Sequence, residues 1–167
     1  MNLIFPFFLG FLIAAVGIIP PGLINMTAAK VSLKDGRNEA IFFAIGATII
    51  VFIQSYSALL FANFINNHPS VINSLEEIGF IIFFSLTIYF LWKAKKTKNS
   101  KTEIKVRSKT NRFFYGMLLA SLNLFPIPYY VFISITLAAY GYFFFEPSYI
   151  YSFVTGAVSG SFLVFYL

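Results

Sequence analysis

The chain contains no cysteine and one histidine, His68. Without cysteine it cannot form a disulfide, a thiolate metal site or a thiol relay. His68 precedes a proline in a polar stretch between two apolar runs, so the paired histidines of a zinc-protease helix cannot be built. No aspartate lies within the long apolar runs, and their serines lack an intramembrane His or Lys partner that would activate a nucleophile. We therefore expect no enzyme, no metal site and no cofactor.

Charged residues are also scarce: they make up 11% of the 167 residues, whereas hydrophobic residues make up 59%. A soluble domain carries about 25% charged residues. Five uncharged runs cover residues 3–29, 40–75, 78–92, 113–145 and 147–167. Since a crossing needs roughly 20 apolar residues, these runs accommodate five crossings. The sequence therefore predicts an all-α integral membrane protein with five transmembrane helices.

All twelve Lys and Arg residues fall in two places. The first group is Lys30, Lys34 and Arg37, and the second is Lys93, Lys95, Lys96, Lys98, Lys101, Lys105, Arg107, Lys109 and Arg112. Lys and Arg bias loops toward the cytoplasm. We therefore expect a multi-pass protein of the cell inner membrane, with its N-terminus outside and both basic loops cytoplasmic. The basic pI of about 9.6 then reflects topology rather than nucleic-acid binding.

We expect the spans at about residues 3–29, 40–64, 71–92, 113–140 and 149–167. The turn after the first span is Lys34-Asp35-Gly36, because Asp-Gly readily adopts turn geometry. Residues 95–110 lack apolar periodicity and are predicted to form a polar, basic, cytoplasmic linker.

Two of these spans are interrupted by proline in corresponding positions. With a shift of 106 residues, Gly10 falls on Gly116 and Pro20 on Pro126. With a shift of 110 residues, a second set of positions in the second span falls on the fifth; these pairs are Phe43 with Phe153, Gly46 with Gly156, Ala47 with Ala157 and Phe52 with Phe162. Interrupted apolar segments in both halves of a chain point to the binding site of a secondary transporter.

The repeat predicts the organisation of the chain. Residues 1–94 form a first repeat of three spans, residues 95–110 are the linker, and residues 111–167 form a second repeat with two spans. An odd number of spans in each unit inserts the second unit upside down, which gives an inverted repeat. The second repeat lacks its third span, so we expect this sequence to be a truncated version of a six-span protein. A genuine five-span protein is the alternative.

Polar residues near the two breaks are the candidates for binding a substrate. Interrupted helices expose N–H groups that suit a carboxylate and carbonyl groups that suit a cation, so two opposed breaks suit an amino acid. The alternative is that the prolines are structural kinks and the polar side chains join helices. The candidate substrate-binding residues are Pro20, Pro21, Gly22, Asn25, Thr27, Gln54, Asn123, Pro126, Pro128, Tyr129 and Tyr130.

Three further features have two interpretations each. Gln54 either faces the same cavity or donates a hydrogen bond to a neighbouring helix. Glu76 and Glu77 either lie at the membrane interface or provide a proton or cation site, since an intramembrane carboxylate is usually functional. Gly156 and Gly160 form a GxxxG pair, which we interpret as close helix packing.

At its two interrupted spans and in the segments beside them, the chain resembles the lysine exporter (LysE) family of amino-acid efflux proteins. The family's first span carries a Pro-Gly-Pro break, where this chain has Pro21-Gly22-Leu23. The resemblance continues through the basic turn at residues 34–37, the Ala-Ile-Gly-Ala sequence at residues 44–47 and Asn123, which stands where members have Asn-Pro. An acidic residue is often found shortly after the span-two glycine in the family, and Ile50 and Val51 stand there in this chain.

The resemblance implies a six-span inner-membrane exporter of amino acids or related metabolites, driven by the proton motive force. We therefore expect a secondary transporter that exports an amino acid or a similar small zwitterion. Its expected partners are that small molecule and membrane lipids, without nucleic acid, and the chain could also form a homodimer. The alternatives are a non-transporting helical scaffold and a channel.

Overall fold

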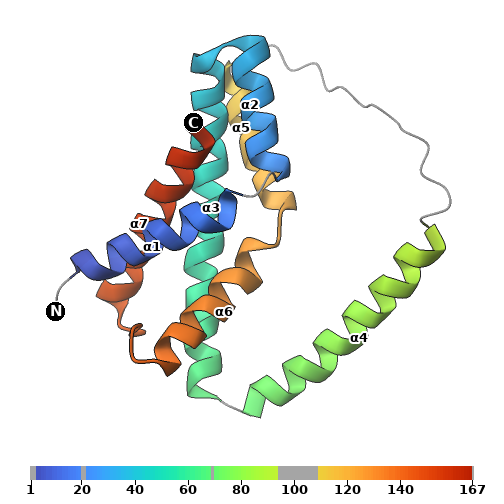
Figure 1. The fold of residues 1–167 in the computed structure, drawn as a ribbon, viewed down its shortest axis with the longest axis vertical. Coiled ribbons are helices and arrows are strands. Elements are labelled where there is room, and N and C mark those ends of the chain that lie inside the picture. Colours follow the sequence, from blue (N-terminus) through green and yellow to red (C-terminus); the bar gives the residue numbers. More distant parts are fainter. Residues whose placement is uncertain (1–2, 20–21, 69, 94–108, 167) are drawn as a thin grey trace. The chain divides into compact units, whose positions relative to one another are not determined.

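The structure is a computed structural model that describes residues 3–19, 22–68, 70–93 and 109–166. The regular elements in this part of the chain are all helices, without strands, as the sequence predicts (Figure 1). Its helices are α1 (Ile4–Ile18), α2 (Leu23–Asp35), α3 (Arg37–Asn67), α4 (Ser70–Lys93), α5 (Lys109–Leu122), α6 (Pro126–Ala139) and α7 (Pro147–Tyr166). The chain divides into two compact units, Met1–Asn63 with Val106–Leu167 and, separately, Phe64–Lys105.

The first predicted span is two helices at an angle of 79°. Helix α1 ends at Ile18, two residues before a proline pair in the sequence, because proline has no backbone N–H with which to continue the helical hydrogen bonds. Helix α2 starts after Gly22, whose backbone is extended (φ −111°, ψ 173°). It ends at Asp35, and the following Gly36 has a φ of 97°, a positive value that glycine adopts without strain.

The fourth predicted span is likewise two helices, at an angle of 59°. Helix α5 ends at Leu122, and Pro126 is the first residue of α6. Proline is favoured at that position because its missing N–H would have no partner within the helix. Both interruptions therefore lie where the prolines of the sequence predict them.

The long helix α3 is the axis of the first unit up to Asn63. Its 31 residues make it about 46 Å long, which exceeds the roughly 30 Å of a bilayer's hydrocarbon core. Phe43, Ala47 and Leu59 on α3 are fully buried. One side of α3 is therefore buried against the other helices of this unit, whereas side chains such as Phe52 and Ile53 are exposed.

Two helix crossings in the first unit are related by the sequence repeat. Helix α1 packs along α7 (Figure 1), and a Cβ added to Gly10 would lie under 3.0 Å from the backbone of Phe153. Gly116 of α5 has the same relation to Phe43 of α3. Gly116 is Gly10 shifted by 106 residues, and Phe153 is Phe43 shifted by 110.

A second pair of contacts obeys the same two shifts. A Cβ added to Gly156 of α7 would lie under 3.0 Å from the backbone of Phe7, and one added to Gly46 of α3 would lie as close to Phe113. Each crossing thus has glycines on both of its helices, where a larger residue would hold the two backbones apart. The division into repeats at residues 1–94, 95–110 and 111–167 remains a prediction.

The surface of these helices is apolar. On α1, the side chains of Phe8, Leu12 and Val16 are all more than half exposed and lie one turn apart, so they form a continuous outward stripe. Among the described residues, α3 and α7 are each long and apolar enough to cross a membrane. Up to four spans result if each bent pair, α1 with α2 and α5 with α6, is one span.

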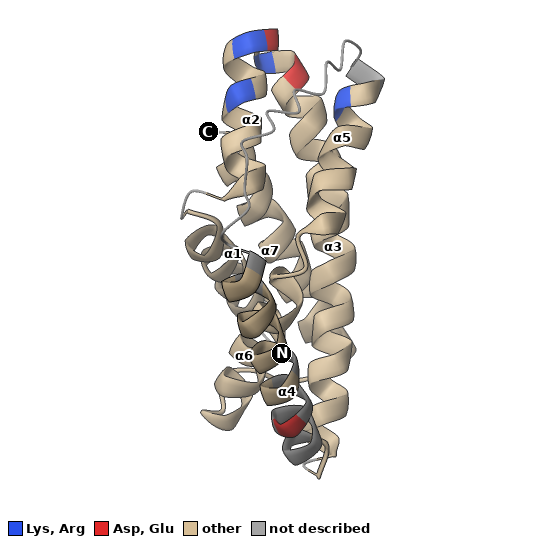
Figure 2. Cartoon of the chain, turned by 90° about the vertical axis from the view of Figure 1, so that its right-hand side faces the viewer, with Lys and Arg blue, Asp and Glu red and all other residues tan. Residues whose placement is uncertain are grey.

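The basic residues of α2, α3 and α5 gather at one end of the first unit (Figure 2). Figure 2 shows the Lys and Arg residues of α2, α3 and α5 at the end where α2 finishes and where α3 and α5 begin. There Arg112 of α5 forms an ion pair of 2.5 Å with Asp35 of α2. Arg37 of α3 donates a hydrogen bond to the Tyr166 hydroxyl of α7.

The second unit contains α4, a helix of 24 residues at the place of the predicted third span. Ser85 and Thr87 of α4 bond back to the carbonyls of Ile81 and Phe83, which satisfies their hydroxyls within the helix. The Glu77 side chain is exposed, whereas that of Glu76 lies outside the described residues. Most of the predicted linker also lies outside them, and its last two residues belong to α5.

Candidate functional site

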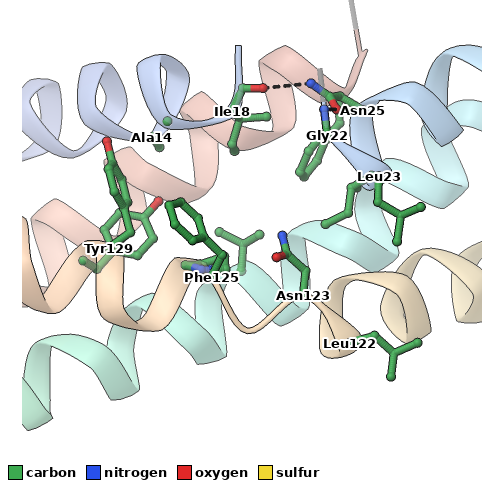
Figure 3. A pocket seen from close by; sticks show the side chains of 15 residues that line it. Ala14, Ile18, Gly22, Leu23, Asn25, Leu122, Asn123, Phe125 and Tyr129 are labelled. Atoms are coloured by element: carbon green, nitrogen blue, oxygen red, sulfur yellow. Dashed lines mark hydrogen bonds between the residues drawn. The ribbon is translucent and has the colours of Figure 1, made fainter. Parts of the chain in front are cut away.

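A cavity of about 500 Å³ lies between the two interrupted spans (Figure 3). Residues on both sides of the two breaks line the cavity, and residues of α3 and α7 complete its wall. The lining residues are Ala14, Gly17, Ile18, Gly22, Leu23, Ile24, Asn25, Val51, Leu122, Asn123, Phe125, Pro126, Tyr129, Tyr130 and Phe165. The two breaks therefore face one shared cavity.

Asn25 holds the first break together. Its Oδ1 accepts hydrogen bonds from the backbone N–H groups of Gly22 (2.7 Å) and Met26 (3.1 Å). Its Nδ2 donates to the carbonyl of Ile18 at the end of α1 (2.8 Å; Figure 3). A helix end in a membrane needs such protein partners because hydrocarbon offers no water. The Asn25 side chain therefore joins α1 to α2.

Gln54 of α3 forms hydrogen bonds with the second break from a position outside the cavity. Its Nε2 donates to the carbonyls of Ala120 (3.0 Å) and Asn123 (2.9 Å) at the end of α5. The Gln54 side chain is buried and does not line the cavity. Of the two interpretations of Gln54, the structure thus supports the hydrogen bond to a neighbouring helix.

The two tyrosines of α6 fix that helix against α1 and α7. The Tyr129 hydroxyl donates to the carbonyl of Ile13 in α1 (2.9 Å), and its ring lies against Gly17. Tyr130 is buried, with its ring edge-on to Phe153 of α7 at 6.3 Å between centroids. The first turn of α6 after the break is therefore held on two sides.

Asn123 differs from these polar residues because its side chain has no hydrogen bond within the described part of the chain. The residue is half-buried and belongs to the short segment between α5 and α6. Figure 3 shows its amide pointing into the cavity, toward the first break. An amide both donates and accepts hydrogen bonds. Asn123 can therefore bind a polar group of a molecule in the cavity.

The structure brings together about half of the residues that the sequence singled out. Those that line the cavity are Gly22, Asn25, Asn123, Pro126, Tyr129 and Tyr130. Gln54 and Pro128 do not, and neither does Thr27, whose hydroxyl donates to the carbonyl of Leu23 (2.6 Å). Pro20 and Pro21 lie outside the described residues.

The sequence reasoning did not single out the apolar part of the wall. Ile18, Leu23 and Phe125 flank the breaks, so their nearness to the prolines is a local signal that could have found them. Val51 of α3 and Phe165 of α7 reach the cavity only through tertiary packing. No local pattern distinguishes these two from the other buried apolar residues of their helices.

The ends of the helices also give the cavity an electrostatic polarity. The N-terminal residues of α2 line it, as do the last residue of α5 and the residue that follows. Partial positive charge gathers at a helix N-terminus and partial negative charge at a C-terminus. Opposite partial charges therefore border one cavity.

Comparison with known proteins identifies the family. The family model described as LysE type translocator matches residues 15–167 of the chain. No curated protein and no solved structure matches it. The match includes both interrupted spans and every described cavity residue except Ala14. The chain therefore belongs to the LysE type translocator family and is a multi-pass membrane transporter.

Proposed function

We propose that the protein exports an amino acid, or a closely related small zwitterion, across the inner membrane by alternating access around the cavity. The observation that carries the proposal is that the two interrupted spans, far apart in sequence, border the same cavity of about 500 Å³. Cavities that hold small ligands have volumes of roughly 300–1,000 Å³. The cavity is thus large enough for one amino acid.

The polarity of the helix ends favours a zwitterion. Leu23 and Ile24 at the start of α2 line the cavity, and the N–H groups of a first helical turn favour a carboxylate, although the Gly22 N–H already donates to Asn25. Leu122 at the end of α5 also lines it, where carbonyl groups favour an ammonium group, although the Asn123 carbonyl already accepts from Gln54. One molecule that carries both groups can satisfy both ends.

Pro126 and Pro128 distinguish α2 from the other helix that starts at the cavity. Pro126 is the first residue of α6 and Pro128 the third, and proline has no backbone N–H. Helix α6 therefore offers fewer donors to an anion than α2 does. The carboxylate is accordingly assigned to α2 and the ammonium group to the end of α5.

The packing of the first unit supports an inverted repeat as the basis of the movement. The α1–α7 and α5–α3 crossings use glycines that are equivalent under the repeat. Two equivalent crossings let the two halves exchange roles, which is how inverted repeats open alternately to each side. The gathering of Lys and Arg at one end of α2, α3 and α5 supports assigning that end to the cytoplasm.

Efflux of labelled amino acids from proteoliposomes with the full-length protein tests the proposal. Gly22→Leu fills the cavity and Asn123→Leu removes its free amide, so each variant should lower efflux by about tenfold or more. Thr27→Val is the matched control, because Thr27 lies near the break without lining the cavity. Its efflux should equal that of the wild type.

Other outcomes would favour the alternatives. A scaffold would move no amino acid at all and would tolerate Gly22→Leu. A channel would show a flux that never saturates with substrate. Normal efflux by both Gly22→Leu and Asn123→Leu would place the transport site elsewhere.

A further inference from the structure

The described wall of the cavity has no formal charge. None of its lining residues is Asp, Glu, Lys, Arg or His. The charged residues of α2 (Lys30, Lys34 and Asp35) and of α5 (Lys109 and Arg112) do not line the cavity. Asp35 and Arg112 pair with each other at 2.5 Å. A charged group of a bound molecule would therefore find no charged side chain among these residues.

Most polar side chains of the wall are already engaged. The Asn25 side chain forms hydrogen bonds with backbone groups at the first break, and the Tyr129 hydroxyl donates a hydrogen bond to the Ile13 carbonyl. The Tyr130 hydroxyl interacts with the buried Ser161 hydroxyl of α7. This leaves the amide of Asn123. The helix ends and this amide suffice for one ammonium and one carboxylate, but they leave nothing for a third charge.

The rest of the wall is aliphatic or aromatic. Its large apolar residues are Ile18, Leu23, Ile24, Val51, Leu122, Phe125 and Phe165. Transfer of an apolar side chain from water to such a surface is favourable in proportion to the area buried. Transfer of an ionised group without a partner is strongly unfavourable.

We propose that the transported amino acids are those with an apolar, uncharged side chain, and that basic and acidic amino acids are excluded. This inference rests on the proposed function. Asn123 then binds the polar end of the substrate, while Val51, Phe125 and Phe165 contact its side chain. The size of the apolar side chain that the substrate can carry is limited by the volume of the cavity rather than by a specific polar contact.

The test is a comparison of leucine, phenylalanine, lysine and glutamate as substrates of the full-length protein in proteoliposomes. Leucine or phenylalanine should be transported at least about tenfold faster than lysine or glutamate at equal concentration. Transport of lysine at a rate equal to or above that of leucine would overturn the inference while the proposed function stands. Absence of transport for all four would overturn both.

A gain-of-function variant tests whether the lack of charge in the cavity wall is the reason that lysine is excluded. Val51 is buried on α3 and lines the cavity, so Val51→Asp adds a carboxylate to the wall and should raise the rate for lysine relative to leucine. Val51→Asn is the matched control with the same shape and no charge, and it should leave lysine excluded. Leu23→Asp, with Leu23→Asn as its control, repeats the test at an exposed wall position if Val51→Asp fails to fold. An unchanged ratio in a folded Asp variant would contradict the inference.

Discussion

The amide of Gln54 spans from α3 to the interrupted end of α5, and this makes its removal a sensitive test of the second break. Nε2 donates to two carbonyls, those of Ala120 at 3.0 Å and Asn123 at 2.9 Å. Its own Oε1 is buried and has no hydrogen-bond partner in the described part of the chain. Gln54 therefore acts through its two donors.

The magnitude follows from those contacts. A hydrogen bond contributes about 0.5–1.5 kcal/mol net, and a buried acceptor left without its donor costs about 1–3 kcal/mol. Interhelical hydrogen bonds in membranes average about 0.6 kcal/mol. Gln54→Leu loses two donors but also removes the unpartnered Oε1, so we expect it to lower the free energy of unfolding by about 1–3 kcal/mol.

Gln54→Glu provides the discriminating comparison. The glutamate side chain has the same shape but replaces the amide nitrogen with an oxygen, which faces two carbonyl acceptors. We therefore expect Gln54→Glu to be less stable than Gln54→Leu, although it changes the packing less. Thermal unfolding in detergent, followed by circular dichroism, measures both, with about 2–4 °C expected per kcal/mol.

The opposite order of stability would refute this reasoning. If Gln54→Glu were as stable as the wild type, the two hydrogen bonds would not hold the end of α5. If only Gln54→Leu were unstable, the loss would come from packing. Thr48→Val on the same helix is a control, because the Thr48 hydroxyl bonds to the Ala44 carbonyl one turn back (2.7 Å) and ties no second helix.

The remaining predictions concern the crossings, the charged end and the first break. Gly10→Ala and Gly116→Ala should each lower stability by about 1–3 kcal/mol, because the added Cβ meets backbone in both crossings; tolerance of either in thermal unfolding would contradict the close approach. Asp35→Asn should lower stability by about 1–3 kcal/mol because it leaves the buried Arg112 unpaired. The double variant Asp35→Arg/Arg112→Asp, which swaps the two charges, should restore part of the lost stability. A double variant no more stable than Asp35→Asn would argue against pairing. Asn25→Leu should impair both thermal stability and efflux, since its side chain joins α1 to α2; a fully stable variant would show that the first break closes without it.

Local chemistry explains what the sequence could predict. Proline fixes where a helix stops, so the ends of α1 and α5 fall beside the interruptions that the sequence predicts. Apolar runs fix the class of protein, and the all-helical structure and the family match confirm it. The cavity residues at the breaks, such as Gly22 and Asn123, follow from the same local signal.

Tertiary packing decides what the sequence left open. Gln54 could reach a cavity or a neighbouring helix, and only the position of the α5 carbonyls selects the second. Thr27 bonds back to its own helix, and Val51 lines the cavity although it lies far from both breaks in sequence. The count of five spans, the inverted topology and the role of the cavity residues remain predictions.

Substrate protection of single cysteines at the two breaks tests the central claim most directly, because the chain has no cysteine of its own. Leu23→Cys lies at the first break and Phe125→Cys at the second, and both positions line the cavity; Thr27→Cys is the control outside it. The rate of thiol modification is measured with and without a saturating amount of whichever amino acid is transported fastest. We predict that the substrate slows modification at both breaks and leaves the control unchanged. Protection at one break alone, or at neither, would contradict a shared substrate cavity.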